Sequence, residues 1–461
     1  MPLNMDSKTV PTLGETLKQL GMLQSALAQQ LTETLELPLE QAFGRILKQP
    51  AITESHPFLN SFSDNLNEYL EQTGKKNNAL CDSIIQCPAM QQADHSGILL
   101  DDEIFLNNLF FSMALSSKNI PYGLTIQCST VKCISARAPL KGPLFLKDGN
   151  QPVRLSDLSN SQLKSRSFCN LPTPFQISIS APADQQDSRW KRLREMWNTK
   201  TFTCAEDAFI AINTELGKQI KYATGTEIVF LDERFTSFLA AKQLLNAQLP
   251  LADMIFDATL RSLILNIKET TIDSDDNFVL GHDLTDFFYF KSEQKLELLA
   301  IENCTTGAEL ILKRRSDGTV LARVGKRELV RMLEDGRLFC DRFLGYFVRC
   351  FGTGLKALGG TSQQDSVGLY QSILRKSNTQ LQFMNTPFEN LCFRDELTFL
   401  AGAPFFEGID SSLLDSINQS STDNLGSFIE LIKTRKVKQL IGNFQSCHYL
   451  LKNAVKNKER Q

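Results

Sequence analysis

Hydrophobic residues recur at helical spacing in the first part of the chain. The leucines of residues 13–31 follow one another at intervals of three or four residues, and the pattern resumes after Pro38. This spacing places apolar side chains on one face of a helix. We therefore expect two helices over residues 12–50 and a third over 63–73, which together form a helical N-terminal cap over residues 1–78.

The middle of the chain mixes helical and strand patterns. In two places an Asp-Gly dipeptide separates apolar runs, at Asp148-Gly149 and Asp317-Gly318. Asp-Gly is a strong hairpin signal because it tolerates the positive φ that such turns need. Each hairpin is followed by a helical pattern. The first unit is expected to comprise strands over 144–146 and 153–155 and a helix from Ser156; the second, strands over 309–313 and 319–324 and a helix over 326–334.

The remaining patterns complete a mixed α/β core over residues 79–376, followed by a helical C-terminal region over residues 377–461. The alternation of strand and helix patterns is typical of this class. The other expected elements are a buried helix over 104–116, a strand over 122–133, helices over 189–245 around a strand at 227–231, a helix over 252–267, strands over 287–290 and 296–301, a buried helix over 343–358 and a loop over 359–368.

Composition limits the kind of protein. The chain has 461 residues, a net charge of −3 and an isoelectric point near 6.0. A surface that follows nucleic-acid phosphates usually carries a basic excess, so we expect no nucleic-acid partner. Because no window approaches the 18 apolar residues of a membrane span, we expect no membrane association either.

Cysteine usage indicates the compartment. The eleven cysteines are scattered at irregular spacing, which suits a reducing environment and no disulfide framework. The N-terminus carries Asp6 and Glu15 and lacks the apolar run of a secretory signal. We therefore expect a soluble, cytoplasmic protein in which each cysteine is a buried apolar side chain.

Histidine is scarce, and two of the four histidines lie beside aspartates. The pairs are Asp94-His95 and His282-Asp283, each close to a glycine. Asp94 or His95 would suit proton transfer or contact with a polar ligand, and a purely structural role is the alternative. A metal-dependent hydrolase would require His95 and His282 to converge; no short metal-ligand motif such as HExxH is present, and we expect no metal.

A glycine-rich segment offers a second candidate site. Gly359, Gly360 and Thr361 lie between two apolar segments, and Gln364 follows. Glycines and hydroxyl residues before a helix expose backbone N–H groups to an anion. A helix C-cap and turn is the alternative. Neither a Walker motif nor GxGxxG occurs, so the segment predicts an anion site without specifying a nucleotide.

The order of features from residue 90 to residue 376 resembles the putative cysteine-adding ligases of bacillithiol biosynthesis. The similar segments are Met90–Leu100 with the apolar helix after it, the second hairpin with Glu328-Leu329, and Gly359-Gly360 with Leu369-Tyr370-Gln371. The family's Gly-Pro-Gly-Glu is replaced here by Gly359-Gly360-Thr361-Ser362. The resemblance implies a Rossmann-like core with β-hairpin insertions.

Together these observations favour a biosynthetic enzyme of the ligase or transferase type that acts on a small polar or anionic metabolite or nucleotide, with ATP or ADP as the cofactor to test. Gln92, Asp94 and His95 would line one side of a single site. The segment from Gly359 to Gln364 would line the other side. The alternative is a non-catalytic partner-binding protein on an enzyme-like fold, which the loss of the family's acidic position favours. The oligomeric state stays open.

Overall fold

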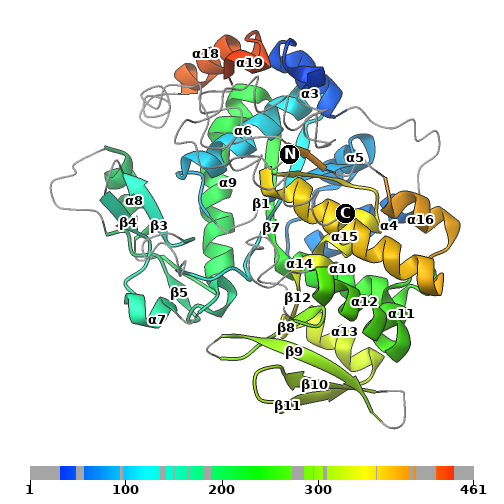
Figure 1. The fold of residues 1–461 in the computed structure, drawn as a ribbon. Helices are drawn as coiled ribbons and strands as arrows, with labels where there is room; N and C mark the ends of the chain where they lie inside the picture. The colour runs from blue at the N-terminus through cyan, green and yellow to red at the C-terminus, as the bar shows by residue number, and fades with distance from the viewer. Residues whose placement is uncertain are drawn as a thin grey trace, which may run out of the picture.

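The centre of the computed structural model is a parallel sheet of five strands, in the order β14-β13-β1-β2-β7 (Figure 1). Its strands are β1 Ala89–Ala93, β2 Tyr122–Gln127, β7 Glu227–Asp232, β13 Lys356–Gly359 and β14 Thr398–Leu400. The structure describes residues 32–47, 57–93, 97–134, 142–148, 151–164, 166–180, 188–198, 200–271, 285–293, 295–304, 309–359, 361–394, 398–400 and 422–440.

Helices cover both faces of this sheet, because successive side chains of a strand point to opposite sides. Met90, Leu124 and Leu231 pack on one side with helices α4, α5, α10 and α15. Phe230 and Leu358 pack on the other side with α6 and α9. The helices are α4 Pro57–Gln72, α5 Asn78–Gln86, α6 Asp102–Ser116, α9 Ala205–Thr224, α10 Glu233–Leu245 and α15 Thr361–Leu381.

A second sheet is antiparallel, with the order β11-β10-β9-β8-β12. Its inner side chains share the core of α10 and α15, and helix α13 packs against α10. This part comprises α11 Leu251–Phe256, α12 Ala258–Thr271, β8 Phe288–Lys291, β9 Leu296–Asn303, β10 Leu310–Arg314, β11 Val320–Val324, α13 Lys326–Glu334, β12 Leu338–Cys340, α14 Arg342–Tyr346 and the π-helical turn η2 Phe347–Phe351.

A smaller unit with its own apolar core lies between β2 and α9. Phe168 and Trp197 are buried in that core, and Phe209 of α9 packs with them. The unit comprises two small antiparallel sheets, the hairpin β3–β4 and the pair β5–β6, which flanks α8 in the sequence, together with short helices. Its elements are β3 Phe145–Asp148, β4 Gln151–Arg154, α7 Asn160–Lys164, η1 Phe168–Asn170, β5 Phe175–Gln176, α8 Ser188–Trp197 and β6 Thr201–Phe202.

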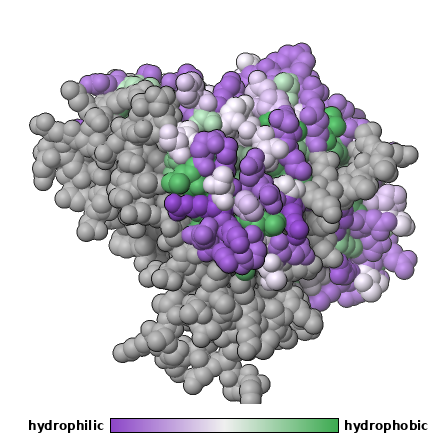
Figure 2. All heavy atoms as spheres, turned by 90° about the horizontal axis from the view of Figure 1, so that it is seen from above, coloured by the Kyte–Doolittle hydropathy of each residue, from purple (hydrophilic) through white to green (hydrophobic). Residues whose placement is uncertain are grey.

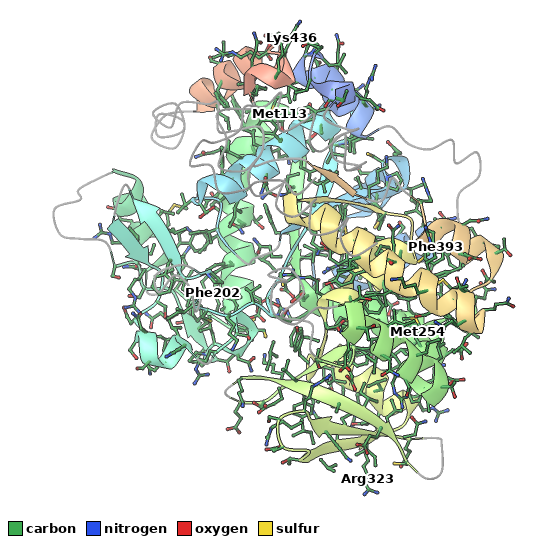
Figure 3. The ribbon with its side chains drawn as sticks, viewed as in Figure 1. Met113, Phe202, Met254, Arg323, Phe393 and Lys436 are labelled. Atoms are coloured by element: carbon green, nitrogen blue, oxygen red, sulfur yellow. The ribbon has the colours of Figure 1, made fainter. Side chains whose placement is uncertain are left out.

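Segments from the two ends of the sequence pack together on the parallel-sheet core. The backbone N–H of Leu39 in α3 donates to the Arg435 carbonyl at 2.9 Å, and the Val437 N–H donates to Leu37 at 3.0 Å. Glu36 pairs with Lys436 and Lys438, and Lys436 lies at the top of the molecule in Figure 3. Seen from above, the surface over these helices is mainly hydrophilic, with small separate hydrophobic spots (Figure 2). These helices are α3 Leu39–Ile46, α18 Thr422–Lys433 and α19 Val437–Leu440, whereas α16 Thr386–Cys392 packs against η2.

The expected mixed α/β class is confirmed, and so are several elements. The helix of residues 104–116 is α6, and the second hairpin-helix unit forms β10, β11 and α13, with Gly318 at φ +71° in its turn. The strand expected over 122–133 ends at Gln127, and the helix expected over 252–267 is interrupted at Asp257, whose carboxylate caps α12. None of the helices in the described ranges combines the length and apolarity needed to cross a bilayer.

Three of the expected secondary-structure elements were wrong, and Cys128, Cys204 and Cys304 are only partly buried, against the expectation that every cysteine is buried. The buried helix over 343–358 ends at Phe351, and Lys356–Gly359 is a strand of the central sheet. Gly354, at φ +72°, turns the chain between them, a conformation that favours glycine. The expected loop over 359–368 is helical from Thr361. The helix placed at Ser156 begins at Asn160. The limits proposed for the cap, core and C-terminal region stay predictions.

Candidate functional site

Polar residues gather where the parallel strands end. Because all five strands run in the same direction, their carboxyl ends share one edge, which we call the carboxyl edge. The side chains there include Gln92 of β1, Gln127 of β2 and Asp232 of β7, all buried. Charged side chains from α10 and η2 join them, so this edge is far more polar than the sheet faces.

Arg349 of η2 is the most deeply buried cation at this edge, with 3% of its surface exposed. Its Nη1 donates to the Thr236 hydroxyl at 2.9 Å, and its Nη2 donates to Gln92 Oε1 at 2.8 Å. Its Nε has no hydrogen-bond partner among the described residues. The arginine projects from a π-helical turn, a distortion frequent at functional sites.

Glu233, the first residue of α10, holds the loop that follows β2. Its Oε2 accepts the backbone N–H groups of Ser129 at 3.0 Å and Thr130 at 2.8 Å. The Cys128 thiol donates to its Oε1 at 3.4 Å. Burial, followed by the charge of Glu233, raises the pKa of the Cys128 thiol well above its ordinary value. The raised pKa disfavours the thiolate form that a cysteine nucleophile needs.

An acidic and basic network lies beside this loop. Arg234 donates to both carboxylate oxygens of Asp232, with Nη2 at 2.6 Å from Oδ2, and reaches Asp207 at 2.7 Å. Glu206, in the first turn of α9, is 3% exposed. Burial, and then the charge of Asp232, raises the pKa of the Glu206 carboxyl. Glu206 is thus the residue of this group best suited to carry a proton.

The two candidate segments from the sequence reach the carboxyl edge on neighbouring strands. β1 and β13 are paired in parallel with Gln91 opposite Leu358, so the strands arrive at Gln92 and Gly359 side by side. Thr361 and Gln364 belong to the first turns of α15. Asp94, His95 and Gly360 lie outside the described residues, and so does His282.

The segment that begins at Gly97 is anchored beside the carboxyl edge. The Gly97 carbonyl accepts from Gln127 Nε2 at 2.9 Å and from Asn213 Nδ2 at 2.8 Å. The Asn213 side chain also accepts the N–H of Leu99 at 2.8 Å. Side chains of β2 and α9 therefore fix the position of Gly97 and Leu99.

Sequence reasoning missed Arg349, Glu233 and Glu206. Arg349 gave a usable signal, since it is the one charged residue in the apolar run from Phe343 to Leu355. Glu233 and Glu206 gave none, because acidic residues in the first turn of a helix are common on any surface. Only the packing of α9 and α10 against the sheet buries them.

Comparison with known proteins names no relative. No protein-family profile matches the chain, and no curated protein matches it. Within the part of the chain that the structure describes, no three His, Cys, Asp or Glu side chains are grouped so that they could hold a metal ion. The chemistry of the carboxyl edge must therefore be argued from its own residues.

Proposed function

We propose that this protein is a biosynthetic enzyme that binds a small anionic metabolite or a nucleotide at the carboxyl edge of a Rossmann-like core. The observation that carries the proposal is the strand order. Numbered along the chain, the five parallel strands lie in the order 3-2-1-4-5, reading from β7 to β14. The order reverses between β1 and β13. Open α/β sheets bind ligands outside the carboxyl ends of the strands at such a reversal.

The residues at this point suit an anion. Gly359 ends β13 shortly before α15, a helix of 21 residues. Because Gly359 has no side chain, a ligand can approach the backbone there closely. The N-terminus of a helix carries free N–H groups and partial positive charge. We propose that Gly359, Gly360, Thr361 and Gln364 contact the ligand on this side and Gln92 on the other. Asp94 and His95, two and three residues beyond Gln92, would transfer the proton in a ligase or transferase reaction.

Ligand binding is tested by the melting temperature of the purified protein with ATP, ADP, citrate or cysteine. A ligand that binds only the folded state adds about 2.7 kcal/mol at 100 times its dissociation constant, so we expect a clear rise with at least one of them. The variants Asp94→Asn and His95→Asn should keep that rise and lose turnover. Thr226→Val, which removes a buried hydroxyl at the opposite edge of the sheet, is the matched control. If no ligand raises the melting temperature, the non-catalytic partner-binding alternative is favoured.

A further inference from the structure

The guanidinium of Arg349 is buried without a carboxylate partner among the described residues. Both of its hydrogen bonds go to neutral oxygens, and its Nε makes none. Burying an unpaired charge costs several kcal/mol. Lys268, by contrast, is paired with Asp341 at 2.5 Å, whereas Arg261, within the described ranges, resembles Arg349 in donating only to neutral oxygens, those of Ile255 and Asn303.

The surroundings of Arg349 hold its guanidinium in one orientation. Gln92 fixes Nη2 from the end of β1, and Thr236 fixes Nη1 from α10. Gly345 lies one turn earlier; a Cβ there would stand 3.2 Å from Nη2. The arginine is therefore preorganised beside the strand reversal, with donor capacity left over, since a guanidinium carries five N–H groups.

We propose that Arg349 binds an oxyanion of the substrate, a carboxylate or a phosphate group, and that Gln92 and Thr236 position it to do so. This inference rests on the proposed function, because it names the chemical group by which that ligand is held. Arginine suits planar, bidentate recognition of both groups.

The first experiment measures anion affinity by isothermal titration calorimetry at constant ionic strength. The probes are inorganic phosphate, pyrophosphate and ATP, which carry phosphate groups, and succinate, which carries only carboxylates. They therefore show which of the two groups Arg349 binds. Arg349→Met should weaken the probe that binds by about 10- to 100-fold, the range expected for a lost charged hydrogen bond. Arg261→Met is the matched control: Arg261 is 4% exposed and donates to the Ile255 carbonyl from α12. Equal affinity of Arg349→Met and the wild type overturns the inference.

A second variant supplies the missing charge within the chain. Gln92→Glu places a carboxylate where Gln92 Oε1 now accepts from Arg349. If Arg349 lacks a fixed counter-charge, this variant should melt at a higher temperature than the wild type without ligand, and it should lose the response to the anion. If a carboxylate elsewhere in the chain already neutralises Arg349, the added negative charge will lower the melting temperature, and the inference fails.

The outcomes separate the two proposals. Unchanged affinity of Arg349→Met for a probe that the wild type binds removes the role of Arg349 and leaves the carboxyl-edge site in place. Absence of binding by the wild type to every probe removes both. If Arg349→Met does not fold, the melting temperature of Gln92→Glu decides the question.

Discussion

One buried cation, Lys268, is stabilised by an ion pair with a buried carboxylate, that of Asp341. Lys268 and Asp341 are 2% and 0% exposed in their side chains and form an ion pair at 2.5 Å. Lys268 also donates to the Thr285 carbonyl at 2.9 Å, and Asp341 caps α14 by accepting the N–H of Leu344. The pair therefore joins α12 to the antiparallel sheet and to the segment that carries Arg349.

Removing one member of the Lys268–Asp341 pair should reveal the energetic cost of burying the other charge alone. Lys268→Met leaves the Asp341 carboxylate buried without its cation, and we expect a loss of about 3–5 kcal/mol in the free energy of unfolding, measured by urea denaturation. Lys221→Met removes a pair with Glu227 that is half exposed and should cost less than about 1 kcal/mol. A small effect of Lys268→Met would contradict the burial of an ionised pair.

At the scale of elements, close packing of strand against helix depends on single glycines. Gly123 of β2 faces α6: a Cβ there would lie 2.5 Å from Leu115 Cδ1 and 2.9 Å from Phe111 Cε1. Gly368 of α15, by contrast, has no atom within 4 Å of such a Cβ. Gly123 therefore permits close contact between β2 and α6. Gly368 weakens α15, because glycine loses more backbone freedom on folding than any other residue.

The same substitution should therefore have opposite effects at these two positions. Gly123→Ala forces β2 and α6 apart and should destabilise the protein by about 1–3 kcal/mol. Gly368→Ala should stabilise it by about 0.5–1 kcal/mol. Thermal and urea denaturation of both variants gives the comparison. A neutral Gly123→Ala would show that the sheet and α6 are less tightly packed than described.

The buried thiols make the stability of the whole molecule depend on pH. Burial raises the pKa of Cys87 to about 11 and that of Cys350 to about 12, against an ordinary value near 9. When the pKa of a thiol is higher in the folded protein than in the unfolded chain, its contribution to stability is fully present below the unfolded-state pKa. That contribution is lost progressively as the pH rises from the unfolded-state pKa to the folded-state pKa. The protein should therefore become less stable from about pH 9 upward.

The loss should be about 1 kcal/mol per buried thiol between pH 9 and pH 10, because the unfolded thiol goes from about half to almost fully ionised while the folded thiol stays protonated. Urea midpoints of the reduced protein at pH 8, 9 and 10 measure it. Cys350→Ala removes a side chain that is fully buried; it should be less stable than the wild type at pH 8 and should lose less stability by pH 10. Equal slopes for the two proteins would contradict the role of Cys350.

The pattern of hydrophobic residues predicted most of the local structure. Helix α6, the hairpin of β10 and β11, and helix α13 follow from periodicity and from one Asp-Gly turn, which depend on neighbouring residues alone. The prediction of one helix over residues 343–358 was wrong, because a fully buried helix and a fully buried strand both appear in the sequence as continuous apolar runs. The π-helical turn and the strand β13 are fixed by contacts with β1 and α10, which sequence spacing does not record.

The sequence by itself determined the mixed α/β class and drew attention to Gln92 and Gly359, because glycines and polar residues between apolar runs are visible along one chain. Only the tertiary structure decided that these two residues end neighbouring strands, and that Arg349 and Glu233 join them. The reason is physical: strand order and the burial of a charge arise from contacts between residues more than a hundred positions apart, such as Arg349 with Gln92. Local spacing carries no information about such contacts.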